Sequence, residues 1–156
     1  ATQAGLAMMP MALVFVLVSP FTGAFVRSFG ARIVTSGGVS IIGLGLLLIA
    51  IGATLSSFPA EEVGLTLTGL GMGIATGPLM GIAVGAVAAA RSGTASSLIN
   101  VARMAGATIG VAILGSVFAF AGGDETGLRA AMLLGGCVQL GCAAFAWSAR
   151  PKEEQG

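Results

Sequence analysis

Long uncharged and mostly apolar stretches alternate along this chain with short segments that hold nearly all of its charged residues. Among its 156 residues, seven are Lys or Arg, six are Asp or Glu, and none is His. The uncharged stretches are residues 1–26, 33–60, 63–90, 104–123 and 130–149. Each reaches the length of about 20 residues that a helix needs to cross a hydrocarbon core of about 30 Å. The pattern predicts an all-α polytopic membrane protein, which directs the search for function to transport or membrane assembly.

Turn-forming residues mark where the predicted spans end. Gly30 follows the first span, Pro59 follows the second and Pro151 follows the fifth, and a proline disfavours the helical conformation of the residue before it. The expected spans are residues 5–26, 33–55, 63–88, 93–121 and 128–148. We expect them to form one transmembrane bundle over residues 1–150, followed by a polar cytoplasmic tail over residues 151–156. Because the chain lacks an initiator Met and begins almost directly in a span, we also expect it to be the C-terminal piece of a longer protein.

The composition agrees with a membrane location. Hydrophobic residues make up 56% of the chain and charged residues 8%, which is too few to cover the exterior of a soluble domain. Its 26 glycines suit helices in lipid, which associate through close backbone approach at small residues. The net charge of +1 gives no reason to expect a nucleic-acid partner.

The signs of the charges predict the orientation. Short cytoplasmic loops are enriched in Lys and Arg, and acidic residues count for little in this rule. If alternate connections lie in the cytoplasm, Arg129 is the one cationic connection residue outside, and the others lie inside. The inner residues are Arg27, Arg32, Arg91, Arg150 and Lys152. We therefore expect the first span to run from outside to inside and the C-terminus to be cytoplasmic.

Glycines recur at every fourth position of the third span, next to a proline. Because four residues turn a helix by about 400°, these glycines form a slowly drifting stripe along one side. Such a stripe serves either static packing against a neighbouring helix or bending and sliding in a conformational cycle. In the first span, Pro10 and Pro20 likewise interrupt the backbone hydrogen bonds. The packing or hinge candidates are Gly69, Gly73, Gly77, Pro78, Gly81, Gly85, Gly106 and Gly110.

Arg103 is the one charged residue well inside a predicted span. Intramembrane charges are costly and usually face the bundle interior or an aqueous cavity, and Asn100 lies one turn before it on the same side. Two interpretations stay open: Arg103 lines a substrate cavity, or its long side chain extends to the inner headgroups or a neighbouring loop. Gln139 is better suited to an interhelical hydrogen bond than to binding a ligand.

The methionines offer a second kind of candidate lining. Their flexible, polarizable side chains suit a tolerant apolar site, although each also suits ordinary packing. They include Met8, Met9, Met11, Met72, Met80 and Met104.

The residues that enzymes and metal sites use are missing from the spans. Cys137 and Cys142 lie five apart on different faces of one helix, so neither a mutual disulfide nor a metal pair is expected. No span contains a carboxylate, so in a proton-driven protein the titrating group must belong to another part of the chain. We expect no enzymatic activity, no cofactor and no metal.

The segment GAFVRSFGAR, residues 23–32, resembles the loop signature of the major facilitator superfamily. Gly23, Gly30 and Arg32 match that signature, whereas Arg27 stands where an Asp is expected, and this leaves the loop's gating role open. QAGLAMMPMAL and SPFTGAF resemble the span leading into this loop in fourteen-span drug–proton antiporters. GLGMGIATGP and SGTASSLINVARMAGATIGVAILGSVF resemble later spans of the same branch, so the resemblance covers nearly the whole chain.

The resemblance implies a fold and a cavity. The chain would hold the last five spans of the C-terminal six-span half, and the N-terminal half of the same chain would be its partner. The first, third and fourth spans would line the central cavity, while the second and fifth would face lipid. The substrate-cavity candidates are then Asn100, Arg103, Met72, Met80 and Met104.

These observations favour a proton-coupled multidrug exporter in the cell membrane, which works by alternating access on small amphipathic substrates. Its partners would be the lipid bilayer, the N-terminal half, the substrate and protons. The alternatives are a carrier of one specific metabolite and a non-transporting membrane subunit.

Overall fold

A computed structural model describes residues 2–55, 57–85, 88 and 91–148 of the chain, and these residues form helices and turns without a strand. The helices are α1 (Thr2–Val18), the 3-10 helix η1 (Ser19–Phe21), α2 (Thr22–Phe29), α3 (Ala31–Leu55), α4 (Phe58–Gly85), α5 (Ser92–Phe120) and α6 (Glu125–Ser148). Five candidate spans are long and apolar enough to cross a membrane, and the first of them, Met8–Phe29, joins α1, η1 and α2. The predicted all-α architecture with five spans is confirmed. The tail, residues 151–156, and its neighbour Arg150 lie outside the described residues.

The prolines of the first span have different effects. Helix α1 continues through Pro10, whereas Pro20 lies in the 3-10 turn that separates α1 from α2. A proline lacks the backbone N–H that a continuing α-helix needs, and the tighter turn accommodates this loss. The span is therefore two helical pieces joined at η1.

Two turns have clear local causes. Between α2 and α3, Gly30 has φ +81°, a conformation that glycine adopts without steric cost. At the other end of the bundle, α6 begins at Glu125 because Asp124 caps it: the Asp124 Oδ1 atom accepts hydrogen bonds from the backbone N–H groups of Thr126 (2.9 Å) and Gly127 (3.3 Å).

The start of α4 tolerates a proline. The helix begins at Phe58 and has Pro59 in its first turn, where a backbone N–H would have no helical partner in any case.

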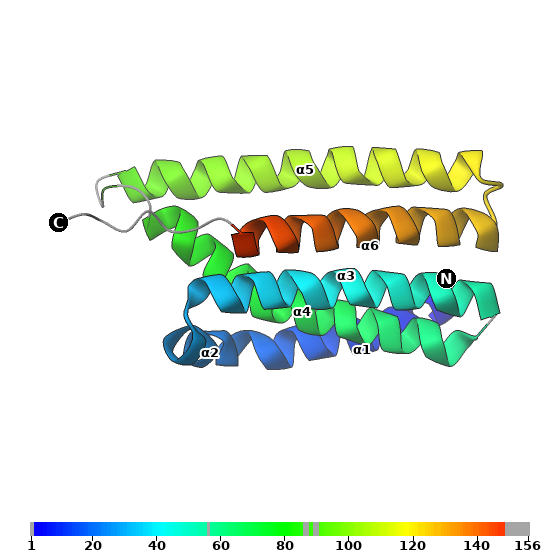
Figure 1. The fold of residues 1–156 in the computed structure, drawn as a ribbon, viewed down its shortest axis with the longest axis horizontal. Coiled ribbons are helices and arrows are strands. Elements are labelled where there is room, and N and C mark those ends of the chain that lie inside the picture. The colour runs from blue at the N-terminus through cyan, green and yellow to red at the C-terminus, as the bar shows by residue number, and fades with distance from the viewer. Residues whose placement is uncertain (1, 56, 86–87, 89–90, 149–156) are drawn as a thin grey trace.

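The long helices run up and down and pack in a chain of neighbours (Figure 1). Helix α3 lies between α4 and α6, α1 packs on α4, and α5 packs mainly on α6 with a smaller contact to α4. No residue of α5 is buried, whereas α3 is the most buried of the candidate spans. Helix α5 therefore stands apart from the rest of the bundle along most of its length.

Small residues make the closest contacts. A Cβ atom at Gly45 of α3 would lie 2.7 Å from the Gly64 carbonyl oxygen of α4, and one at Gly71 of α4 would lie 2.6 Å from the Gly38 carbonyl oxygen. Such approaches are possible only without side chains, and they are how helices associate in lipid, where water supplies no driving force. The buried hydroxyls of Thr35, Ser36 and Thr68 donate to carbonyl oxygens one turn earlier in their own helices, as when Thr68 Oγ1 donates to the Gly64 carbonyl oxygen at 2.9 Å.

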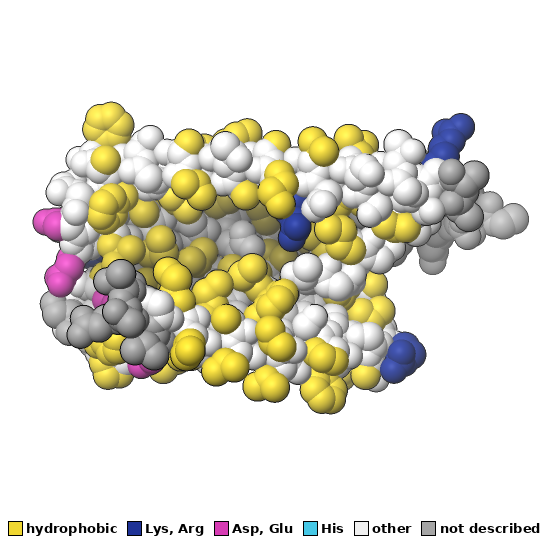
Figure 2. Space-filling model, turned by 180° about the vertical axis from the view of Figure 1, so that it is seen from behind, with side chains coloured by type: hydrophobic (Ala, Val, Ile, Leu, Met, Phe, Trp, Pro, Cys, Tyr) yellow, Lys and Arg dark blue, Asp and Glu magenta, His cyan; other side chains and the backbone are white. Residues whose placement is uncertain are grey.

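The charges separate to the two ends of the bundle. Arg27, Arg32 and Arg91 lie where α2 meets α3 and where α5 begins, while Glu61 and Asp124 lie at the opposite turns. Figure 2 shows acidic side chains at one end, cationic side chains at the other, and one cationic side chain between the two ends. The apolar length between the two ends corresponds to the hydrocarbon core.

Candidate substrate-binding site

The open face of α5 carries a row of polar and sulfur-containing residues. A surface hollow of about 550 Å³ follows this face, and its lining includes Ser97, Asn100, Met104 and Thr108, which recur three or four residues apart. Ser97 Oγ and Thr108 Oγ1 donate to backbone carbonyls one turn earlier, at 3.0 Å each. Their hydrogen-bonding needs are met within the helix, so both can face a changing environment at little cost.

Arg103 lies next to this row and near the middle of the membrane-spanning length. Gly106 is the midpoint of α5, so Arg103 is about 5 Å from it along the helix axis. The Arg103 Nη2 atom donates a hydrogen bond of 3.1 Å to Asn100 Oδ1. The guanidinium group is thus held by a neutral amide one turn away.

The direction of Arg103 follows from helix geometry. Around the α5 axis it lies within about 40° of Ile99, Gly110 and Leu114, which are among the partly buried residues of this helix. Leu114 reaches α6, since its Cδ atoms are 3.8 Å from where a Cβ at Gly135 would be. Arg103 therefore lies on the side of α5 that faces the bundle, yet it is exposed because α5 stands apart there. Figure 2 shows a hollowed region between α5 and the rest of the bundle, with one cationic side chain beside it, away from both ends.

A second groove lies between α1 and α4 and is rich in methionine. It has a volume of about 370 Å³ and an almost wholly apolar lining that includes Met8, Met11 and Met72. Of the other candidates, Met80 is half-buried in the last turns of α4, and Met104 is 59% exposed along the hollow of α5. The sequence offers these methionines as separate candidates, and the structure brings Met8, Met11 and Met72 together.

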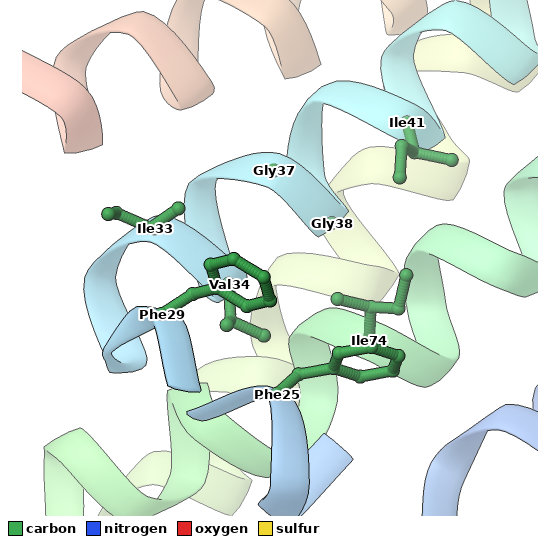
Figure 3. A pocket seen from close by; sticks show the side chains of 8 residues that line it. All are labelled: Phe25, Phe29, Ile33, Val34, Gly37, Gly38, Ile41 and Ile74. Carbon is green, nitrogen blue, oxygen red and sulfur yellow. The ribbon is translucent and has the colours of Figure 1, made fainter. Parts of the chain in front are cut away.

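A third groove was not anticipated from the sequence. Phe25 and Phe29, four residues apart on α2, point toward α3 and toward Ile74 of α4 (Figure 3). With residues of α3 they enclose about 170 Å³ of apolar space beside the signature loop. The spacing of the two phenylalanines was the available signal, although it does not reveal that α2 folds back over α3.

The signature loop has one structural residue and one bridging residue. Gly30 provides the positive φ of the turn, and Arg32 donates from Nε to the Ala146 carbonyl oxygen (3.2 Å) and from Nη2 to the Trp147 carbonyl oxygen. Arg27 is exposed on α2, with its Nη1 atom 3.9 Å from where a Cβ at Gly23 would be. Arg32 thus satisfies carbonyl groups at the C-terminal end of α6, where a positive charge is also favoured by the helix dipole.

The stripe of glycines on α4 has two different halves. Gly69 and Gly73 lie against the backbone of α1 at Met11 and Phe15, and a Cβ at Gly77 would lie 3.5 Å from Thr22 Cγ2. A Cβ at the remaining stripe glycines would have open space within 4 Å, as would one at each glycine candidate of α5. These open positions are Gly81, Gly85, Gly106 and Gly110. Their packing or hinge role stays a prediction.

Pro78 is buried where α4 meets α2. As a proline in a helix interior it cannot donate to the carbonyl of Ile74, one turn earlier. At the neighbouring carbonyl, Gly73 O, the helix receives a hydrogen bond of 2.9 Å from the buried hydroxyl of Thr22. The weakened stretch of α4 is therefore supported from the 3-10 break of the first span.

Metal or redox chemistry has no visible site in the part of the chain that the structure describes. That part contains no group of three or more Cys, Asp or Glu side chains placed to hold a metal ion. Cys137 and Cys142 are free and exposed.

The fold and the site thus define a class, a bundle of membrane-spanning helices with an open, polar-lined face. Comparison with known families gives the particular one: the sequence profile of the Major Facilitator Superfamily matches residues 1–156, and the chain belongs to this family. No solved structure is significantly similar to the chain.

Curated relatives have names that refer to multidrug resistance, transport or drug efflux. The chain is 38% identical over 115 residues to "Multidrug resistance protein Stp" of Mycobacterium tuberculosis, an alignment covering 74% of this chain and 21% of that protein. It is 36% identical over 121 residues to the "Probable actinorhodin transporter" of Streptomyces coelicolor, covering 75% of this chain and 21% of that protein. It is 32% identical over 117 residues to "Drug efflux pump JefA" of Mycobacterium tuberculosis, covering 75% and 23%. The chain therefore spans about a fifth of the length of these relatives.

Proposed function

We propose that this chain is the C-terminal part of a secondary active exporter of drugs and other small amphipathic molecules, located in the plasma membrane. The observation that carries the proposal is the similarity of most of the chain to transporters that include a multidrug resistance protein and a drug efflux pump. Family membership over the whole chain and five membrane-spanning helices support it.

The open face of α5 and the methionine groove form the contribution of this chain to the substrate cavity. Asn100 and Arg103 supply polar contacts, and Met72, Met80 and Met104 supply flexible apolar contacts. An amphipathic molecule needs both kinds of lining, and methionine adapts to substrates of different shape. Helix α4 contacts both α1 and α5, which supports a cavity wall formed by these three helices.

The bundle is oriented with its arginine-rich end in the cytoplasm. Arg27, Arg32 and Arg91 lie at that end, and the positive-inside rule assigns it to the inner leaflet. The C-terminal tail, which follows α6 at the same end, is then cytoplasmic. In a background without Cys137 and Cys142, a membrane-impermeant maleimide added to intact cells is expected to label Gly123→Cys and not Ser28→Cys. Labelling of Ser28→Cys alone would show that the bundle has the opposite orientation.

Transport is driven by protons and proceeds by alternating access. The carboxylates of the described spans, Glu61, Glu62 and Glu125, lie in the first turns of α4 and α6 at the ends of the bundle, so the proton-binding group inside the membrane belongs to the rest of the transporter. The glycine stripe and Pro78 of α4 allow the rearrangement, since small side chains permit helices to slide and a proline removes one backbone hydrogen bond.

Reconstituted full-length protein tests the function. Proteoliposomes with an imposed proton gradient are expected to transport several unrelated amphipathic dyes, and a protonophore should abolish this transport. An unchanged rate after the gradient collapses would remove the coupling. Acceptance of a single metabolite would indicate a specific carrier, and absence of any flux would indicate a non-transporting subunit.

Substitution of Gly77 tests the hinge. The methyl group of Gly77→Ala fits beside the Thr22 side chain, whereas the larger branched side chain of Gly77→Leu would push against Thr22. A folded Gly77→Leu protein that binds dye but does not transport it supports motion at the stripe. A Gly77→Leu protein that fails to fold, beside a fully active Gly77→Ala protein, shows static packing instead.

A further inference from the structure

Arg103 brings a positive charge to the middle of the membrane, and among the described residues its hydrogen-bond partner is the neutral side chain of Asn100. Residues 63–123 contain two charged residues, Arg91 and Arg103, and neither is acidic. The nearest carboxylates of the sequence on either side, Glu62 and Asp124, both lie at the opposite end of the bundle. From Arg103 to the end of α5 at Phe120 the distance along the axis is about 26 Å. An intramembrane arginine normally pairs with another group or faces an aqueous cavity, and an anion that enters such a cavity from outside the described residues would neutralise this charge.

The geometry around Arg103 suits a small anionic group. Because Asn100 Oδ1 accepts the hydrogen bond from Arg103 Nη2, the amide nitrogen of Asn100 is its remaining donor group. The planar guanidinium group binds carboxylate, sulfonate or phosphate oxygens in pairs, more strongly than it binds a neutral acceptor. The two side chains therefore place donors, and no carboxylate acceptor, at the edge of the hollow that Asn100 lines.

The surroundings of this pair suit an apolar body attached to the anion. Met104 lines the same hollow as Asn100 and lies about 40° from it around the helix axis. Met104 is 59% exposed, so its apolar surface is available for contact. An anion without an apolar part would leave this surface in water.

We propose that Arg103, with Asn100, binds the anionic group of acidic amphipathic substrates, so that the transporter prefers organic anions over the corresponding neutral molecules. The proposal rests on the exporter function proposed above and adds the substrate class. A carboxylate from the rest of the transporter is the competing partner for Arg103. In that arrangement, loss of Arg103 would reduce the transport of charged and neutral substrates equally. A comparison of the two kinds of substrate therefore distinguishes the two partners.

The test compares two dyes that differ in one sulfonate group, 8-anilinonaphthalene-1-sulfonate and N-phenyl-1-naphthylamine. Full-length wild type, Arg103→Gln and Arg103→Lys are each reconstituted into proteoliposomes. The rate at which each protein transports each dye under an imposed proton gradient is then measured. Arg103→Gln is expected to reduce transport of the sulfonate about tenfold or more and leave the neutral dye within about twofold. Arg103→Lys should retain part of the sulfonate transport. Arg129→Gln, at the far end of α6, is the matched control and should change neither rate.

The outcomes separate this proposal from the exporter function. Equal loss of both dyes in Arg103→Gln, or unchanged sulfonate transport, overturns the anion site while the exporter function stands. If the wild-type protein transports neither dye, the exporter function fails, and fluorescence titration of the purified protein with the sulfonate dye still decides whether Arg103 binds the anion. If Arg103→Gln does not fold, Asn100→Ala provides the same comparison, with selective weakening of the sulfonate expected and an equal effect on both dyes overturning the proposal.

Discussion

The buried hydroxyl of Thr22 lies 2.9 Å from the main-chain carbonyl oxygen of Gly73, 51 residues away on another span, and shares its one proton between this oxygen and that of Ser19, also at 2.9 Å. Thr22 follows the 3-10 turn that contains Pro20, and Gly73 lies five residues before Pro78. The two spans in which proline weakens the helix are thus joined at their weak points. A side-chain hydroxyl can do this in lipid, where an unpaired backbone carbonyl has no water to bind.

Removing this hydroxyl is expected to destabilise the bundle. Thr22→Val keeps the shape of the side chain but cannot donate, so the free energy of unfolding should fall by about 0.5–1.5 kcal/mol. Thr22→Ser keeps the hydroxyl and should retain most of the stability. Unfolding of the full-length protein in mixed micelles titrated with SDS measures both, and equal values for Val and wild type would contradict the role of the hydrogen bond.

A second prediction concerns the contact between Arg32 and the end of α6. Arg32→Gln removes the charge that faces the Ala146 and Trp147 carbonyl oxygens, so the last turn of α6 should fray. We expect a loss of about 0.3–1 kcal/mol in unfolding free energy and faster amide hydrogen exchange in that turn. Arg27→Gln, on the exposed side of α2, serves as the control. If both variants exchange at the same rate as wild type, Arg32 does not hold α6.

The close approach of α3 and α4 gives a third prediction. In Gly45→Ala the new methyl group would lie 2.5 Å from Thr68 Oγ1 and 2.7 Å from the Gly64 carbonyl oxygen, so the helices must separate. The cost should be about 1–3 kcal/mol, seen as a lower melting temperature in detergent. Gly37→Ala lies on the same helix with open space within 4 Å and should be neutral or slightly stabilising. Equal melting temperatures for the two variants would show that α3 and α4 are less tightly packed.

A fourth prediction follows from the cap of α6. Backbone hydrogen bonds from Gly127 and Thr126 hold the pKa of the Asp124 carboxyl below its ordinary value of 3.8. Because the folded-state pKa is depressed, the stabilisation is present above the unfolded-state pKa and is lost as the pH falls through the folded-state pKa. The difference in melting temperature between wild type and Asp124→Ala should therefore be largest near neutral pH and shrink below about pH 4.

Asp124→Asn separates the charge from the hydrogen bonds in this experiment. Asparagine is also a good cap but does not titrate, so its advantage over Asp124→Ala should stay constant across the same pH range. A wild-type advantage that is equally insensitive to pH would show that the ionised carboxylate contributes nothing at the cap.

Much of the architecture could be predicted from the sequence because it depends on local properties. The number and type of the spans follow from uninterrupted apolar length between charged residues, as in the stretch from Glu62 to Arg91. The separation of Arg27 and Arg32 from Glu61 and Asp124 follows as well, because short connections force consecutive spans to run in opposite directions. The bilayer imposes the same length and polarity requirement on every span, so no tertiary information is needed.

The tertiary structure alone decided which small and polar residues meet. Gly45 and Gly81 look alike in the sequence, yet the first lies against α4 and the second has open space beside it, because the position where two helices cross selects the residues that touch. The same reason hid the bonds from Thr22 to Gly73 and from Arg32 to α6, which join residues far apart along the chain. The sequence alone could not show which side of α5 Arg103 occupies relative to the other helices. A single arginine fits the headgroup region or a cavity equally well, and its side is known only once α5 is placed beside its neighbours.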